Sequence, residues 1–184
     1  MRKIIKHREI VEDSWIELRA AEGEDAAALT VPAGKVIVPL ATWQAQADAL
    51  TARRAAGEIG VWFASDERAE TLQGELDKFA VVAVDFPKFT DGRGMSTAYN
   101  LRMRLGYKGE LRAIGDVLRD QLFSMSRVGF NAYATRQDRS IEDALKGLTD
   151  FSETYSASVD QQVPLFRRHA RGVPAETLEI GAGI

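Results

Sequence analysis

Short hydrophobic runs alternate with amphipathic segments along most of the chain. The apolar, β-branched runs predict buried strands at 36–38, 59–64, 80–84, 111–114 and 130–134. Apolar residues at helical spacing predict helices at 42–56, 65–79, 96–106, 116–127 and 140–151. This alternation predicts an α/β fold of about five repeated strand–helix units on a mainly parallel sheet. The sheet is expected to be either an open three-layer sheet or a partial TIM-like barrel.

Capping residues mark several of the expected helix ends. Thr42 is the predicted start of the first helix, and Gly57 is its predicted C-terminal stop. Ser96 and Asp116 are the predicted N-caps of two later helices. A capping-box pattern at Ser140 predicts the start of the last helix.

The first 30 residues show a different pattern. Two extended segments, Ile4–Val11 and Trp15–Ala20, flank a polar turn at Glu12–Ser14, which predicts an N-terminal β-hairpin. We expect a single domain with three parts: the hairpin and a loop at 1–30, an α/β core at 35–152, and a polar tail at 153–184 whose glycine-rich end frays.

Composition narrows the possible functions. The chain has 184 residues, of which 45% are hydrophobic, which suits one compact domain. The net charge is -3 and both signs are interspersed, so we expect no nucleic-acid partner. The chain has no cysteine, which excludes disulfides, thiol redox chemistry and cysteine-bound clusters. His7 and His169 lie near opposite ends, and we predict no metal site.

No segment of the sequence predicts a signal peptide or a membrane span. Lys6, His7 and Arg8 interrupt the apolar residues near the N-terminus. No apolar run approaches the roughly 20 residues that a helix needs to cross a bilayer. We therefore expect a cytoplasmic protein with no membrane partner.

The most informative candidate for ligand binding is the loop that follows the third core strand. Ligands of parallel α/β sheets bind beyond the carboxyl ends of the strands. Here Gly92 and Gly94 allow the backbone to approach a ligand, and Arg93 is suited to an oxyanion. The helix expected to begin at Ser96 would also favour an anion. The alternative is an Asp91–Arg93 ion pair that only rigidifies the loop.

Two further charged residues follow strand ends. Asp116 comes after the fourth strand and could act as a general acid or base, or cap a helix. Arg136 comes after the fifth strand and joins the candidate anion-binding residues. Asp116 and Asp91 are the candidate catalytic carboxylates. If they serve one site, they should converge with Arg93 and Arg136 on one cleft.

Several common motifs are absent from the sequence. It has no Gly-x-Gly-x-x-Gly fingerprint, no Walker-type phosphate loop and no Gly-x-Ser-x-Gly elbow. A Rossmann dehydrogenase, a P-loop NTPase and an α/β-hydrolase are therefore disfavoured.

The stretch from Phe89 to Phe130 resembles one bacterial family, the domain of unknown function numbered nine-three-four. The resemblance is carried by four motifs: Phe-Thr-Asp-Gly-Arg-Gly at 89–94, Leu-Arg-x-Arg-x-Gly-Tyr-x-Gly-Glu-Leu-Arg-Ala at 101–113, Gly-Asp-Val-Leu-Arg-Asp-Gln-Leu at 115–122, and Arg-x-Gly-Phe at 127–130. Members of that family are described as probable oxidoreductases involved in sulfite reduction. The resemblance implies sulfur assimilation, with genes beside those of assimilatory sulfite reductase.

Three functions follow from these expectations. The first is an accessory protein of assimilatory sulfite reduction, which docks on sulfite reductase or its electron donor. The second is an oxidoreductase with a non-covalent flavin or nicotinamide, whose phosphate would bind at Arg93 and Ser96. The third is a small oxyanion-binding protein, or an enzyme that uses Asp116 as a base. Enzymatic activity, the cofactor and a homo-oligomeric state stay open at this point.

Overall fold

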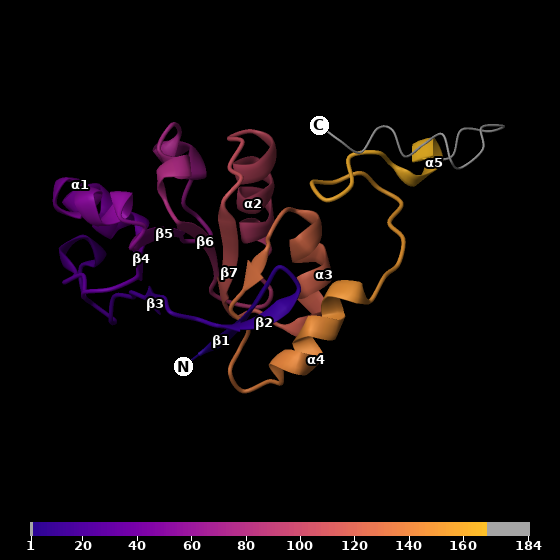
Figure 1. Ribbon diagram of the computed structural model, residues 1–184, viewed down its shortest axis with the longest axis horizontal. Coiled ribbons are helices and arrows are strands. Elements are labelled where there is room, and N and C mark those ends of the chain that lie inside the picture. The colour runs from indigo at the N-terminus through magenta and orange to yellow at the C-terminus, as the bar shows by residue number, and fades with distance from the viewer. Residues whose placement is uncertain (1, 169–184) are drawn as a thin grey trace.

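A computed structural model describes residues 2–168 of the chain (Figure 1). The predicted fraying of the glycine-rich end concerns residues outside this range. The strands are β1 Lys3–Lys6, β2 Glu9–Glu12, β3 Ile16–Glu17, β4 Val36–Pro39, β5 Ile59–Phe63, β6 Val81–Phe86, β7 Glu110–Gly115 and β8 Ala132–Tyr133. The α-helices are α1 Leu40–Ala55, α2 Arg93–Met103, α3 Arg119–Arg127, α4 Ile141–Lys146 and α5 Leu165–Arg168. The short 3₁₀ helices are Ala26–Ala28, Ala69–Leu72, Leu76–Lys78 and Gly147–Thr149.

The strands of residues 2–168 form one curled, mixed sheet of eight strands in the order β2-β1-β8-β7-β6-β5-β4-β3. Strands β3 to β8 run parallel, whereas β1 is antiparallel to both β2 and β8. Helices α1, α2 and α3 each follow a parallel strand and precede the next one. The predicted α/β fold is therefore correct, and its strand–helix repeat is confirmed in part.

The repeat breaks between β5 and β6, where the expected helix at 65–79 is wrong. Two separate 3₁₀ helices stand there instead. Gly74 lies between them with φ of 83°, a conformation that ends a helix. Leu72, Leu76 and Phe79 are still buried, as their spacing predicts. The apolar pattern therefore identified the buried face, although the glycine changed the backbone.

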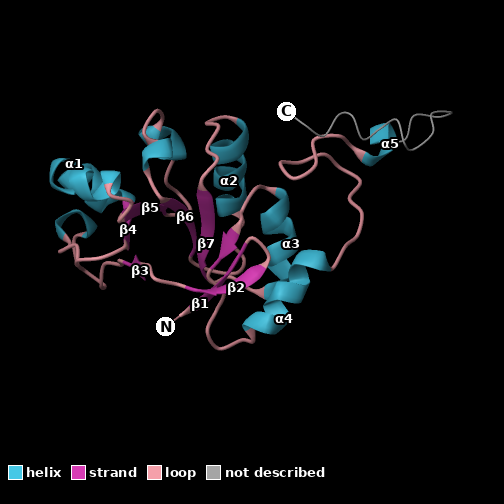
Figure 2. Cartoon of the chain, in the orientation of Figure 1, coloured by secondary structure: helices cyan, strands magenta, loops and turns pink. Residues whose placement is uncertain are grey.

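Within residues 2–168, the α-helices that pack on the sheet cover one of its faces. Figure 2 shows α1 to α4 around the outside of the curl. The larger hydrophobic cluster joins this convex face to the helices through residues such as Trp43, Val84 and Leu122. A smaller cluster on the concave face has no buried member from an α-helix: Ile4, Ile37, Val81, Ala83, Ile114 and Ala134. The sheet is thus a half-barrel rather than an open three-layer sheet.

The N-terminal hairpin is present, but its predicted turn is wrong. β1 pairs with β2 around His7 and Arg8, whose φ angles of 49° and 65° suit a tight hairpin turn. The second predicted hairpin segment instead supplies β3, which pairs with β4 at the opposite sheet edge. The segment between β2 and β3 crosses from one edge to the other, on the open side of the curl (Figure 1).

The predicted helix caps at Ser96 and Asp116 are wrong. Helix α2 begins at Arg93 with Gly92 as its N-cap, so Ser96 lies inside the helix. Helix α3 begins at Arg119 with Leu118 as its N-cap. Asp116 lies two residues before this N-cap. Its backbone N–H donates to Phe86 O at 2.7 Å, and this hydrogen bond holds Asp116 against the end of β6.

Three other predicted helix ends can be compared with the structure. Helix α1 begins at Leu40, before Thr42, and the Thr42 hydroxyl donates to Ala26 O at 2.6 Å instead of capping. The Ser140 cap is confirmed, because its hydroxyl accepts the Asp143 N–H at 3.1 Å. Gly57 follows α1 with a φ of 75°, as expected of a C-terminal stop. Within the described part of the chain, no helix combines the length and apolar character required to cross a membrane.

Candidate functional site

The parallel strands of the half-barrel end at one edge, which we call the carboxyl edge. Ligand sites of parallel α/β sheets form at such an edge. Because β1 is antiparallel to β8, its first residues also lie there. Arg2 demonstrates this, since its Nη2 donates to Ala134 O at 3.4 Å. The N-terminal residues therefore belong to the candidate site, although they are remote from it in sequence.

Asp91 and Arg93 form an ion pair within the loop between β6 and α2. Arg93 Nε lies 2.9 Å from Asp91 Oδ1, and Nη2 lies 2.7 Å from Oδ2. The Ser65 hydroxyl also donates to Oδ2, at 2.8 Å. The hydrogen bonds from Arg93 and then from Ser65 hold the pKa of Asp91 well below its usual range. Both carboxylate oxygens are thus engaged, which is the geometry of a pair that rigidifies the loop.

The glycines and the serine of this loop take part in helix packing. A Cβ atom on Gly94 would lie 2.8 Å from Phe86 Cζ, so glycine allows α2 to sit closely on the sheet. Gly92 is the N-cap of α2, and a Cβ atom added to it would meet nothing within 4 Å. Ser96 lines a separate depression on the side of α2, beside Glu67 and Arg68. Gly92, Gly94 and Ser96 therefore do not form one pocket together with the Arg93 guanidinium.

Asp116 and Arg136 form a second pair between the ends of β7 and β8. Arg136 Nη1 lies 3.2 Å from Asp116 Oδ1, and the Phe89 N–H donates to Oδ2 at 2.8 Å. Arg136 also binds both oxygens of Asp138, at 2.9 and 2.7 Å. Asp138, and then Asp116, raises the pKa of the Arg136 guanidinium. Asp116 therefore fastens the Phe89 loop to the end of β8.

The predicted site residues fall into these two pairs. Among residues 2–168, no hydrogen bond or ion pair joins Asp91 or Arg93 to Asp116 or Arg136. The nearest connection is the backbone of the loop that carries both Phe89 and Asp91. The structure therefore brings each carboxylate to an arginine without bringing all four side chains into contact.

A row of charged residues at the carboxyl edge was missed by the sequence analysis. Asp85 is only 7% exposed and accepts a 2.7 Å hydrogen bond from Arg19 Nη2. Arg19 Nη2 lies 3.6 Å from Glu17 Oε2, and Arg2 Nη1 lies 2.9 Å from Glu17 Oε1. The strand predicted at 80–84 stops one residue before Asp85, whereas β6 extends to Phe86. Strand alternation could have found it, because it shares a strand face with the buried Val81.

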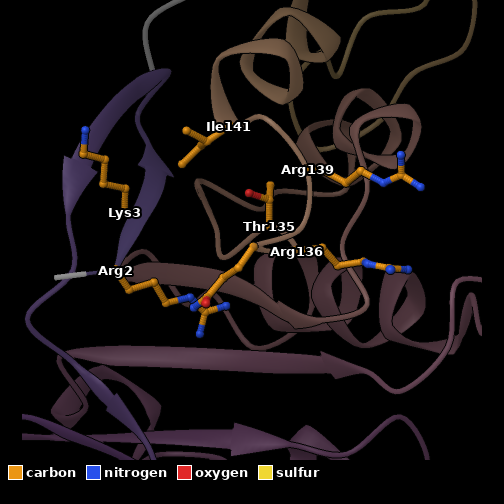
Figure 3. A pocket seen from close by; sticks show the side chains of 7 residues that line it. Arg2, Lys3, Thr135, Arg136, Arg139 and Ile141 are labelled. Carbon is orange, nitrogen blue, oxygen red and sulfur yellow. The ribbon is translucent and has the colours of Figure 1, made fainter.

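The row ends at a cavity of about 350 Å³ beside β8. Its lining contains four cationic side chains and no carboxylate: Arg2, Lys3, Thr135, Arg136, Gln137, Arg139 and Ile141. In Figure 3 the Thr135 hydroxyl and Ile141 point toward β1, whereas Arg136 and Arg139 extend to the opposite side. Arg2 Nε is buried and has no hydrogen-bond partner in the described structure. An acceptor at this position would remove an unsatisfied donor.

This arrangement favours anion binding over acid–base or metal chemistry. The carboxylates of Asp85, Asp91 and Asp116 each pair with an arginine and accept its hydrogen bonds. Over residues 2–168, no group of three or more histidine, aspartate or glutamate side chains is placed to hold a metal ion. Arg2 and Arg136 are paired with carboxylates as well, but the buried Arg2 Nε–H has no acceptor, and such a donor suits an oxyanion.

Comparisons with known proteins return one family. A family model described as "Bacterial protein of unknown function (DUF934)" matches residues 60–166, from β5 into α5. No curated protein and no solved structure matches the chain. The match covers the Asp91–Arg93 and Asp116–Arg136 pairs and the β8 side of the cavity.

Proposed function

The chain belongs to the bacterial DUF934 family, whose function is unknown. We propose that it is an oxyanion-binding accessory protein of assimilatory sulfite reduction. One observation supports the binding activity. The carboxyl-edge cavity is lined by cationic and neutral side chains alone, and Arg2 in its wall has an unused buried donor. The sulfite context comes from the sequence resemblance.

The electrostatics of the cavity suit a small oxyanion. Guanidinium groups bind oxyanions through short, charge-assisted hydrogen bonds. Hydrogen bonds to Glu17 and to Ala134 O place the Arg2 guanidinium beside the cavity. Lys3 lines the same cavity and adds positive charge, whereas the charges of Arg136 and Arg139 are partly neutralised by Asp138.

The oxidoreductase alternative gains less support from this geometry. It places a cofactor phosphate at Arg93 and Ser96, which the sequence had joined in one anion pocket. Arg93 pairs with Asp91, and Ser96 lies within α2 against a different depression. Arg2 also pairs with a carboxylate, that of Glu17, but it keeps a buried N–H without an acceptor, so the cavity at Arg2 has the stronger argument for binding an anion.

Titration of the purified chain with sulfite, sulfate and phosphate is expected to detect binding that depends on Arg2. Calorimetry of the Arg2→Gln variant should show about a ten- to hundredfold loss of affinity, because one charge-assisted contact disappears. Arg93→Gln is the matched control, since it removes another arginine from the same edge. Its affinity should equal that of the wild type. If Arg93→Gln lost binding and Arg2→Gln did not, the anion site would lie at the Asp91–Arg93 loop instead. If the wild type bound none of the three anions, the proposal would be refuted.

The accessory role predicts a physical complex with sulfite reductase or its electron donor. Purification of the tagged chain from its native cells under sulfate-limited growth should co-purify one of these two proteins, identified by mass spectrometry. An unrelated tagged protein from the same cells provides the background. Recovery of neither protein would argue strongly against the accessory role, while leaving the anion-binding activity to the titration above.

A further inference from the structure

The carboxyl-edge cavity is larger than an inorganic oxyanion. One water molecule takes about 30 Å³ in the liquid, so an ion of four or five heavy atoms needs about two or three such volumes. The cavity has about 350 Å³. This value lies within the range of about 300–1,000 Å³ that is usual for sites of organic small molecules. An inorganic anion would leave most of the space to water.

The walls of the cavity differ in chemical character. Arg2, at the start of β1, and Thr135, after β8, present a guanidinium and a hydroxyl. Ile141, the first residue of α4, presents a half-buried apolar side chain, and Gln137 presents an amide. Figure 3 shows Ile141 and the Thr135 hydroxyl directed toward the same side of the cavity. A ligand that contacts both therefore needs a polar end and a less polar body.

The hydrogen bonds of Arg2 indicate where the polar end binds. Nη1 donates to Glu17 and Nη2 donates to Ala134 O, which leaves the buried Nε–H without an acceptor. A small shift of the side chain would offer Nε–H to an oxyanion that enters beside Thr135. Thr135 is only 5% exposed, and its hydroxyl can donate to the same ion. The body of the ligand then lies against Ile141.

From these contacts we infer that the ligand is an organic oxyanion: a phosphate, sulfate or sulfonate group joined to a carbon-containing body. This inference rests on the proposed function, because it assigns the ligand class of the same site. The anionic group binds at Arg2 and Thr135. The organic body packs on Ile141 and displaces water that an inorganic ion would leave in place.

The test compares inorganic and organic anions that carry the same charged group. Calorimetric titrations of the full chain use phosphate against phenyl phosphate, and sulfate against phenyl sulfate. We expect each phenyl compound to bind at least about tenfold more tightly than its inorganic counterpart, because its additional atoms are buried. Ile141→Ala should lose most of this preference and leave inorganic binding unchanged. Arg2→Gln should weaken both classes.

Met103→Ala is the control for a general effect of removing an apolar side chain, because Met103 is exposed on α2, away from the cavity lining. It should retain the preference, and thermal melts should show that all variants are folded. Equal affinity for organic and inorganic ions would overturn the inference and leave oxyanion binding intact. The same conclusion follows if Ile141→Ala keeps the full preference. Binding of none of the four anions would refute both the inference and the proposed function.

Discussion

Replacing Arg112 with alanine is expected to lower the free energy of unfolding by about 3–5 kcal/mol. Arg112 is only 1% exposed, at the amino end of the concave face. Its Nη1 lies 2.9 Å from Asp13 Oδ2, and its Nη2 lies 2.6 Å from Glu110 Oε1. Removal of the guanidinium leaves two carboxylates with little access to water and without this cation. Such uncompensated burial costs far more than the loss of an exposed ion pair.

Guanidinium-induced unfolding, followed by tryptophan fluorescence, measures this loss. Arg119→Ala is the matched control because Arg119 lies 2.9 Å from Asp150 while 45% of its side chain is exposed. The control should change stability by no more than about 1 kcal/mol. A loss below about 1 kcal/mol in Arg112→Ala would contradict the assigned role of the buried network.

The same variant tests how the open side of the half-barrel is covered. Asp13 belongs to the segment that crosses between β2 and β3, and Arg112 ties it to the central strand β7. Loss of this tie should increase amide hydrogen exchange in Asp13 and its neighbours before it does so in β6. An equal increase in exchange around Asp13 and in β6 would show that the crossing segment and the central sheet open together.

Replacing Gly115 with alanine is expected to cost about 2–5 kcal/mol of stability. Gly115 has a φ of 91°, which is unfavourable for a residue with a side chain. A Cβ atom would also lie 2.5 Å from Phe86 O and 2.6 Å from Asp85 Oδ1. Neither atom can move freely, since Phe86 O accepts from Asp116 N–H and Asp85 Oδ1 accepts from Arg19.

Gly57→Ala separates the two causes of this loss. Gly57 has a similarly positive φ of 75°, but its added Cβ would meet nothing within 4 Å. Chemical unfolding of Gly57→Ala should therefore show only the backbone cost, about 1–2 kcal/mol. Equal losses in the two variants would mean that the contacts with Phe86 and Asp85 contribute nothing.

Features encoded by neighbouring residues were predicted from the sequence. The buried run of β6 and the apolar spacing of Leu72, Leu76 and Phe79 identified core residues correctly. Gly57 and Ser140 marked the end and the start of helices where the structure has them. Each of these signals depends on a few adjacent side chains and on backbone sterics, which act in the same way wherever the segment is placed.

The helix starts predicted at Ser96 and Asp116 were wrong. Serine and aspartate are common N-cap residues, but a residue of capping type does not have to cap a helix. The Asp116 carboxylate instead accepts hydrogen bonds from the Phe89 N–H, 27 residues earlier in the chain, and from Arg136. An aspartate just before a helical pattern predicts an N-cap, even where its carboxylate accepts hydrogen bonds from other donors in the folded protein. The pairing of β7 with β6 and with β8 places Asp116 beside these two donors, which follow β6 and β8 in the chain. Such pairing between distant strands cannot be read from the residues around Asp116.

By itself, the sequence determined the α/β class, the buried strands and the charged residue types at their ends. The tertiary structure alone decided that the sheet curls into a half-barrel, that β1 joins β8, and that Arg2 lies beside Thr135 in the cavity wall. The Arg112–Asp13 pair joins residues 99 positions apart, and the Arg2–Ala134 contact joins residues 132 apart. Local propensities act over a few residues, whereas such contacts depend on which distant strands lie next to each other.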